Sequence, residues 1–167
     1  MSRLEYRKGF DLLVEVIPEI CRRNPNVYWI IGGDGTKMPV LRFLVKKCGL
    51  ESRVEILGMV PQGEVQNVLN RGHVFINTSI TEAFCIAVLE AVACGLKVVS
   101  TNVGGIPEIL PKDMVLLCDP KSKDLLAKLE EAVADYKNFS PSEFNSRVAS
   151  YYSWRDVAKR TESCYRK

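Results

Sequence analysis

Apolar residues along the chain form short continuous runs that alternate with longer stretches in which they recur every three or four positions. The runs are rich in β-branched residues and end at glycine or polar residues, which is typical of buried strands. The longer stretches have the periodicity of helices with a buried face. This pattern predicts strands at 27–31, 53–57, 73–77, 97–100 and 114–117, and helices at 10–23, 37–48, 61–70, 84–94, 122–136 and, as one or two elements, within 141–167.

Short strands that alternate with helices predict an α/β fold, a Rossmann-like parallel sheet with helices on both faces. A length of 167 residues suits one domain, which we expect to span residues 1–167. In sheets of this kind, ligands bind beyond the carboxyl ends of the strands. The candidate site residues described below fall at such ends.

Composition narrows the classes of function. The 23 basic and 20 acidic residues leave a net charge of +3, without a basic stripe that contains interleaved aromatic residues, so nucleic acid is not an expected partner. The six cysteines form no Cys-x-x-Cys pair and there is one histidine, so we expect neither a zinc site nor a disulfide framework. No apolar run approaches the ~20 residues that span a bilayer, and we expect this chain alone to be soluble.

One segment, 81–95, contains a charge that a purely structural helix would not keep. From Phe84 to Cys94 the sequence is apolar on every helical face except at Glu90, and a helix that is apolar all round belongs in a core. Burying a carboxylate without partners costs several kcal/mol. We therefore expect Glu90 to meet hydroxyl groups, a cation or a ligand.

A second acid, Glu82, precedes the same segment. If the helix begins near Phe84, then Glu82 lies in the preceding loop and Glu90 in the second turn, with its side chain leaning back toward the helix N-terminus. Both acids would then lie near the N-terminus of this helix. There the free N–H groups of Phe84, Cys85 and Ile86, and the positive end of the helix dipole, suit a phosphate or a developing negative charge.

These residues resemble a known family. Glu82, seven residues, Glu90 and then Ala91 and Gly95 are similar to the E-x7-E element of retaining glycosyltransferases with the two-domain GT-B architecture. In detail, nearly the whole chain resembles the catalytic subunits of phosphatidylinositol N-acetylglucosaminyltransferases, which act first in GPI-anchor synthesis. The runs that carry this resemblance are 3–9 (RLEYRKG), 77–84 (NTSITEAF), 98–107 (VVSTNVGGIP) and 152–165 (YSWRDVAKRTESCY).

The resemblance implies a fold and an activity. The chain would be the C-terminal, donor-binding half of a GT-B enzyme, expected to lack both its first strand and the N-terminal domain that binds phosphatidylinositol. The implied reaction transfers N-acetylglucosamine from UDP-N-acetylglucosamine to phosphatidylinositol with retention, without a metal or other cofactor. The parent enzyme would work with other subunits of a membrane complex on the cytoplasmic face of the endoplasmic reticulum. We expect the isolated chain to be inactive.

The resemblance also assigns roles. Arg3 and Lys8 would hold the diphosphate; positive side chains at a helix start are unfavourable unless an anion binds there, although a solvated basic loop is the alternative. Glu82 would hold sugar hydroxyls and Glu90 the ribose diol. Ile56, at the end of a predicted strand, would either contact the uracil or pack in the core.

The loop Gly32-Gly33-Asp34-Gly35-Thr36 follows a predicted strand and is open to several readings. We expect Gly33 and Gly35 to contact the donor. A dinucleotide fingerprint would need a glycine where Met38 stands, and a P-loop would need a Gly-Lys-Ser/Thr ending. The loop also resembles the nucleotide loop of diacylglycerol and NAD kinases, and Thr36 departs from the proline that is common in the transferases. A kinase-like domain and a noncatalytic nucleotide-sugar-binding protein that completes an enzyme in trans therefore remain alternatives.

Overall fold

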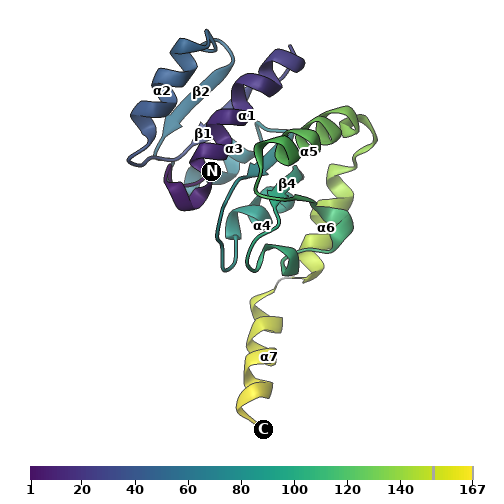
Figure 1. Ribbon diagram of the computed structural model, residues 1–167. Helices are drawn as coiled ribbons and strands as arrows, with labels where there is room; N and C mark the ends of the chain where they lie inside the picture. The colour runs from purple at the N-terminus through teal and green to yellow at the C-terminus, as the bar shows by residue number, and fades with distance from the viewer. Residues whose placement is uncertain (152, 167) are drawn as a thin grey trace.

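The structure is a computed structural model that describes residues 1–151 and 153–166 (Figure 1). Tyr152, which begins one of the four matching runs, and Lys167, the last residue of the predicted domain, lie outside the described residues. The strands are β1 (Trp29–Gly32), β2 (Val54–Gly58), β3 (Val74–Asn77), β4 (Lys97–Thr101) and β5 (Leu116–Cys118). The helices are α1 (Phe10–Arg23), α2 (Met38–Lys47), α3 (Val65–Leu69), α4 (Ile86–Ala93), α5 (Ser122–Ala134), α6 (Pro141–Tyr151) and α7 (Trp154–Tyr165). Short 3-10 turns are η1 (Tyr6–Lys8), η2 (Gln62–Glu64), η3 (Ile106–Glu108), η4 (Lys112–Met114) and η5 (Tyr136–Asn138).

Each predicted strand and helix has its counterpart in the structure. The largest differences are at two element starts. The predicted helix 61–70 is the turn η2 followed by the short helix α3, and the last strand begins at Leu116 because η4 occupies the residues before it. The α/β class is confirmed.

All the described strand pairs are parallel, but they form two sheets. In one sheet β1 pairs with β2, and in the other the order is β3-β4-β5. Ile31 lies opposite Ile56 in the first sheet, and Ile76 lies opposite Val99 in the second. The predicted Rossmann-like parallel arrangement is therefore confirmed, and among the described residues it is divided into two parts between β1 and β3.

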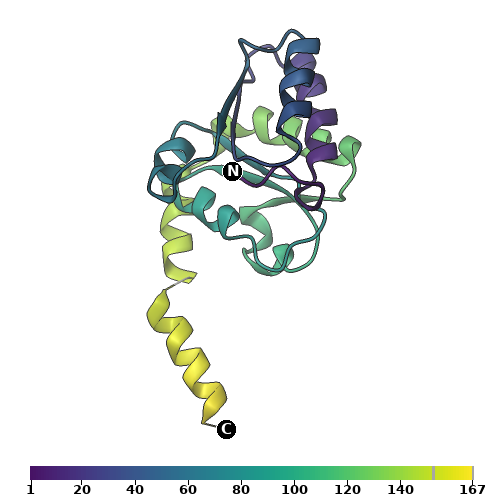
Figure 2. The same cartoon turned by 90° about the vertical axis from the view of Figure 1, so that its left-hand side faces the viewer.

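Two apolar cores cover the two faces of the larger sheet. Neighbouring residues of β4 show this, since successive side chains of a strand point to opposite faces. Val99 belongs to the core formed with α1, α2 and α5, whereas Val98 belongs to the core formed with α4 and α6. Figures 1 and 2 show these helices on either side of the strands. The predicted cover of helices on both faces is confirmed.

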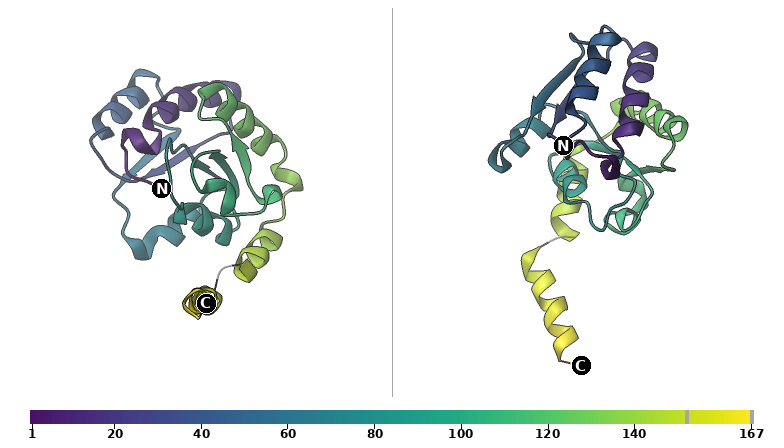
Figure 3. Two further views of the ribbon diagram at one scale, coloured as in Figure 1. Left: turned by 60° about the horizontal axis from the view of Figure 1, so that its bottom comes forward. Right: turned by 60° about the vertical axis from the view of Figure 1, so that its left-hand side comes forward.

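Helix α7 extends away from the rest of the chain (Figure 3). Its described side chains are mostly exposed. Among the described residues, no helix combines the length and the apolar character that crossing a bilayer requires.

Candidate functional site

Two predicted site residues that lie 74 positions apart meet at the carboxyl ends of the strands. Lys8, in the turn η1, and Glu82, in the loop after β3, form an ion pair in which Nζ lies 2.5 Å from Oε2. Their side chains are only 26% and 14% exposed. The pair is therefore screened from water far better than a surface salt bridge, and its attraction is correspondingly stronger.

Backbone contacts hold the two loops together. The N–H of Ile80 donates to the carbonyl of Arg7 at 2.9 Å, and the Thr78 hydroxyl donates to the carbonyl of Lys8 at 2.7 Å. Gly9 lies in the left-handed region, with φ 67°, and a Cβ atom there would lie 1.6 Å from the carbonyl oxygen of Thr78. Only glycine fits this approach, which brings Lys8 within reach of Glu82.

A series of hydrogen-bonded polar side chains, mostly buried, connects β4 to the Glu82 carboxylate. The amide of Asn77 donates to the Ser100 hydroxyl at 2.9 Å. The Ser79 hydroxyl lies 2.9 Å from Asn77 Oδ1 and 3.4 Å from Glu82 Oε2, and because a hydroxyl has one proton it donates to one of these acceptors at a time. The sequence reasoning missed these residues. The signal in the sequence was the polar run 77–79, which directly continues an apolar strand. In the structure this run is buried.

The helix behind Glu82 starts later than predicted. α4 begins at Ile86 with Cys85 as its N-cap, so Phe84 precedes the helix rather than opening it. Cys85 is buried, and burial raises the pKa of its thiol. Phe84 and Ile86 are 47% and 63% exposed, so the prediction of an apolar segment buried on all sides is wrong at this end. The first-turn N–H groups belong to Ile86 and Ala87.

Glu90 lies in α4 and is half-buried. Its Oε1 accepts a hydrogen bond from the side-chain amide of Gln62 at 3.3 Å. This partner is an amide from the turn η2, not one of the hydroxyl groups, cations or ligands that we expected, so the contact of Glu90 with a ligand stays a prediction. Burial lowers the pKa of the Met1 amino group, and the nearby Glu90 carboxylate acts in the opposite direction. Glu90 is therefore close to the N-terminal segment.

The glycines of the 32–36 loop contact protein backbone. A Cβ atom on Gly33 would lie 1.7 Å from the carbonyl oxygen of Ser2, and one on Gly35 would lie 2.5 Å from that of Leu4. Packing against residues 2–4 therefore accounts for both glycines, and their contact with a donor stays a prediction. Arg3 points outward; its side chain is 75% exposed, and its guanidinium lies 3.8 Å from Glu5.

The structure also places Ile56, which the sequence left open, and the loop after β4. Ile56 packs against the core that contains α1 and α2, as its structural interpretation requires. The N–H of Gly105 donates to the carbonyl of Glu82 at 3.0 Å, so the loop after β4 positions the backbone of this acid. The site is thus built from η1 and the loops after β3 and β4.

The geometry can be set beside known proteins. The family model described as "Glycosyl transferases group 1" matches residues 1–148. The chain is 54% identical over 165 residues to a phosphatidylinositol N-acetylglucosaminyltransferase subunit of Arabidopsis thaliana. The aligned region covers 99% of this chain and 37% of that protein. The chain is also 48% identical over 168 residues to the human protein of the same name, covering 99% and 35%. The chain therefore spans about a third of the length of these curated relatives.

A solved structure supports the fold. The structure described as "Anabaena Alr3699/HepE in complex with UDP" superposes with a TM-score of 0.82 and 22% identity, covering 98% of this chain and 47% of that one. The likeness shows a shared GT-B half-domain fold.

Proposed function

Because the chain belongs to the group 1 glycosyltransferases, we propose that it forms the donor-binding half of a retaining transferase that moves N-acetylglucosamine from UDP-N-acetylglucosamine to phosphatidylinositol. The screened Lys8–Glu82 pair at the strand ends carries this proposal. The names of the curated relatives support the choice of reaction, and the Anabaena complex supports a UDP-linked donor.

Lys8 is suited to the departing diphosphate. A lysine ammonium has three donors, and the pair with Glu82 uses one of them. The remaining donors can bind phosphate oxygens while the pair persists, and they stabilise the negative charge that develops as the sugar leaves. The first-turn N–H groups of α4 add positive potential on the same side. Arg3 points outward in the structure, so it would bind the diphosphate only if its side chain turned inward when the donor binds.

Glu82 is suited to the sugar. Its carboxylate accepts hydrogen bonds, and the Ser79 hydroxyl can donate one to it beside Lys8. A carboxylate in this place also favours the positive charge that develops on the sugar ring in the transition state. The proposal assigns no covalent nucleophile and no metal.

Binding of the acceptor and assembly at the membrane are assigned to a longer protein, of which this chain would be one part. Phosphatidylinositol would be bound by a separate N-terminal domain, and the assembly would include other subunits at the cytoplasmic face of the endoplasmic reticulum. The word "subunit" in the relatives' names supports such an assembly. Alone, the chain is expected to bind the donor without turning it over.

Calorimetric titration with UDP-N-acetylglucosamine, followed by a transfer assay with and without a separately expressed acceptor domain, tests the proposal. We expect donor binding by the chain alone and turnover only after mixing, unchanged by EDTA. Binding without turnover in the mixture would assign a noncatalytic nucleotide-sugar-binding subunit. Selective binding of ATP would instead assign a kinase-like domain and refute the proposal.

Glu90→Gln tests the ribose assignment. If Glu90 accepts hydrogen bonds from the ribose hydroxyls, the variant should bind UDP about tenfold more weakly, the usual effect of losing a charge-assisted bond. It should also lose most of the preference for UDP over 2′,3′-dideoxy-UDP. Gln62→Ala, which removes the protein partner of Glu90 but leaves the carboxylate, is the matched control and should keep that preference. An unchanged preference in Glu90→Gln would remove the assignment.

A further inference from the structure

Helix α2 carries apolar side chains on the side that faces away from the sheet. Leu41 and Val45 are buried in the core that α2 shares with α1, and on an ideal helix Phe43 lies about 160° around the axis from each of them. Phe43 is 67% exposed, and Val40, one turn before it, is 48% exposed. Figures 1 and 3 show α2 at the outer edge of the molecule.

Basic residues flank these apolar side chains. Lys37 directly precedes α2, and Arg42, Lys46 and Lys47 belong to it. Among the described residues, none of these four cations forms an ion pair. The segment 35–50 contains no acidic residue, and its four positive charges exceed the net charge of the whole chain, which is +3. The positive charge of the protein is therefore concentrated on this helix.

This arrangement of charge is unfavourable for the helix itself. Arg42 and Lys46 are four positions apart and hence neighbours on the surface of α2, and like charges at this spacing destabilise a helix. Lys37 is the N-cap residue, where the helix dipole disfavours a cation. In α1, by contrast, both arginines of the last turn pair with Glu19. An anionic partner beside α2 would relieve the repulsion that its own sequence leaves in place.

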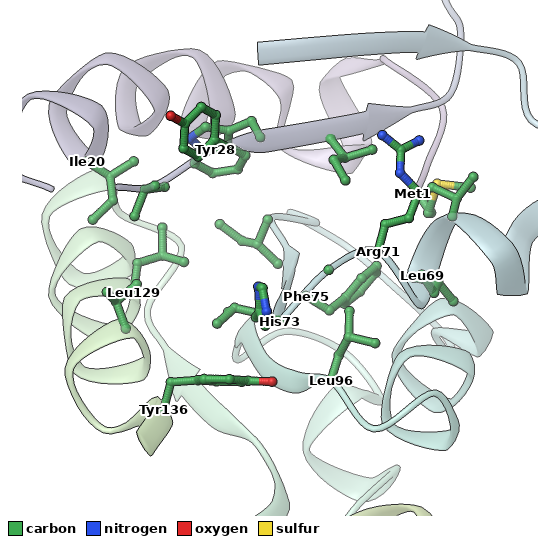
Figure 4. A pocket seen from close by; sticks show the side chains of 18 of the residues that line it. Met1, Ile20, Tyr28, Leu69, Arg71, His73, Phe75, Leu96, Leu129 and Tyr136 are labelled. Atoms are coloured by element: carbon green, nitrogen blue, oxygen red, sulfur yellow. The ribbon is translucent and has the colours of Figure 1, made fainter. Parts of the chain in front are cut away.

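The exposed side of α2 is separate from the cavities of the molecule. A cavity of about 480 Å³ lies between β1 and β3, where Figure 4 shows Ile20, Phe75 and Leu129 around it. A smaller cavity of about 240 Å³ lies beside β5. None of the residues that line either cavity comes from α2. Phe43 therefore projects from a convex helix surface, which suits an extended partner better than a small molecule.

We propose that the outward side of α2 docks on an anionic phospholipid surface, with Phe43 inserted among the headgroups and Lys46 and Lys47 against the lipid phosphates. Such a surface supplies negative charge on all sides of the helix, and its boundary with the acyl chains accepts an apolar side chain. Each Lys or Arg near an anionic membrane raises the affinity about fivefold. The inference adds a contact surface to the membrane setting of the proposed function, but it does not require sugar transfer.

Co-sedimentation of the 167-residue chain with sucrose-loaded vesicles, without donor or acceptor, tests the proposal. Phosphatidylcholine vesicles that contain about 30% phosphatidylserine should bind the chain at least about tenfold more tightly than pure phosphatidylcholine, and the difference should shrink as salt is added. Phe43→Ser should weaken binding to the anionic vesicles about tenfold, because it removes the inserted ring. Tyr28→Ser, at an aromatic residue that is 69% exposed, is the matched control and should leave binding unchanged.

The contribution of the charges is tested separately. Lys46→Gln combined with Lys47→Gln should weaken binding to the anionic vesicles about 25-fold, since two cations are lost. Lys123→Gln combined with Lys137→Gln changes the net charge equally at exposed positions outside α2. It should weaken binding by no more than about twofold, because salt screens charges that lie far from the membrane. Equal effects of the two double variants would overturn the proposal.

Insertion of the ring is measured with Phe43→Trp. Brominated anionic vesicles should quench its fluorescence more strongly than that of Tyr28→Trp, since the two native tryptophans are common to both variants. Equal quenching, or equal binding of the unaltered chain to anionic and neutral vesicles, would refute the docking. So would a dimer of the unaltered chain that Phe43→Ser dissociates, measured by light scattering, because that result would assign this side of α2 to a second copy.

Discussion

Replacing Gly9 with alanine is expected to lower the free energy of unfolding by about 2–5 kcal/mol. The left-handed conformation of Gly9, with φ 67°, costs a residue with a Cβ atom about 1–2 kcal/mol. The new methyl group would also lie 1.6 Å from the carbonyl oxygen of Thr78, and relieving such a clash in a packed structure typically costs about 1–3 kcal/mol. Urea unfolding of both proteins measures the difference.

Gly49→Ala is the matched control for this prediction. Gly49 has nearly the same conformation, with φ 63°, but a Cβ atom there would meet nothing within 4 Å. It should therefore show only the conformational cost of about 1–2 kcal/mol. Equal losses for the two variants would mean that the close approach of Gly9 to Thr78 contributes nothing to stability.

Separation of the two loops should also disturb the site. Movement of Thr78 away from residue 9 weakens the bond between its hydroxyl and the carbonyl of Lys8, and it shifts the loop that carries Glu82. UDP affinity of Gly9→Ala, measured in the folded fraction, should therefore fall, while that of Gly49→Ala should not. The local packing of one glycine thus links stability to the geometry of the ion pair.

The order of strands and helices could be predicted from sequence because it depends on local patterns. α1 begins after Gly9 and ends before Asn24 as expected, since the apolar stripe between them has a clear helical period. The start of α4 was placed at Phe84 for the same kind of reason, but Phe84 and Ile86 are apolar and exposed. Periodicity identifies apolar positions and cannot tell which of them find a partner.

Contacts between distant segments were beyond such patterns. Lys8 and Glu82 were each assigned to a ligand, and their pairing depends on how the loop after β3 folds against η1. Gly33 was likewise assigned to the donor, although a Cβ atom on it would collide with Ser2. In both cases the resemblance to a family suggested the function of the residue, whereas the intramolecular contact could be found only in three dimensions.

Lys8→Met is expected to weaken UDP binding by about 10- to 100-fold, because it removes a charge-assisted hydrogen bond to the diphosphate, worth about 1.5–3 kcal/mol. The same change leaves the Glu82 carboxylate, only 14% exposed, without its cation. We therefore also expect a loss of about 1–3 kcal/mol in the free energy of unfolding. Lys47→Met, the same substitution at an exposed position at the end of α2, should change neither quantity appreciably.

The two effects of Lys8→Met have different causes, and a double variant separates them. Glu82→Gln added to Lys8→Met removes the unpaired charge, so the free energy of unfolding should recover most of its loss. UDP affinity should not recover, because the diphosphate still lacks its cation. If affinity returned together with stability, Lys8 would act on the nucleotide only by keeping the loop of Glu82 folded, and its direct contact with the diphosphate would be refuted.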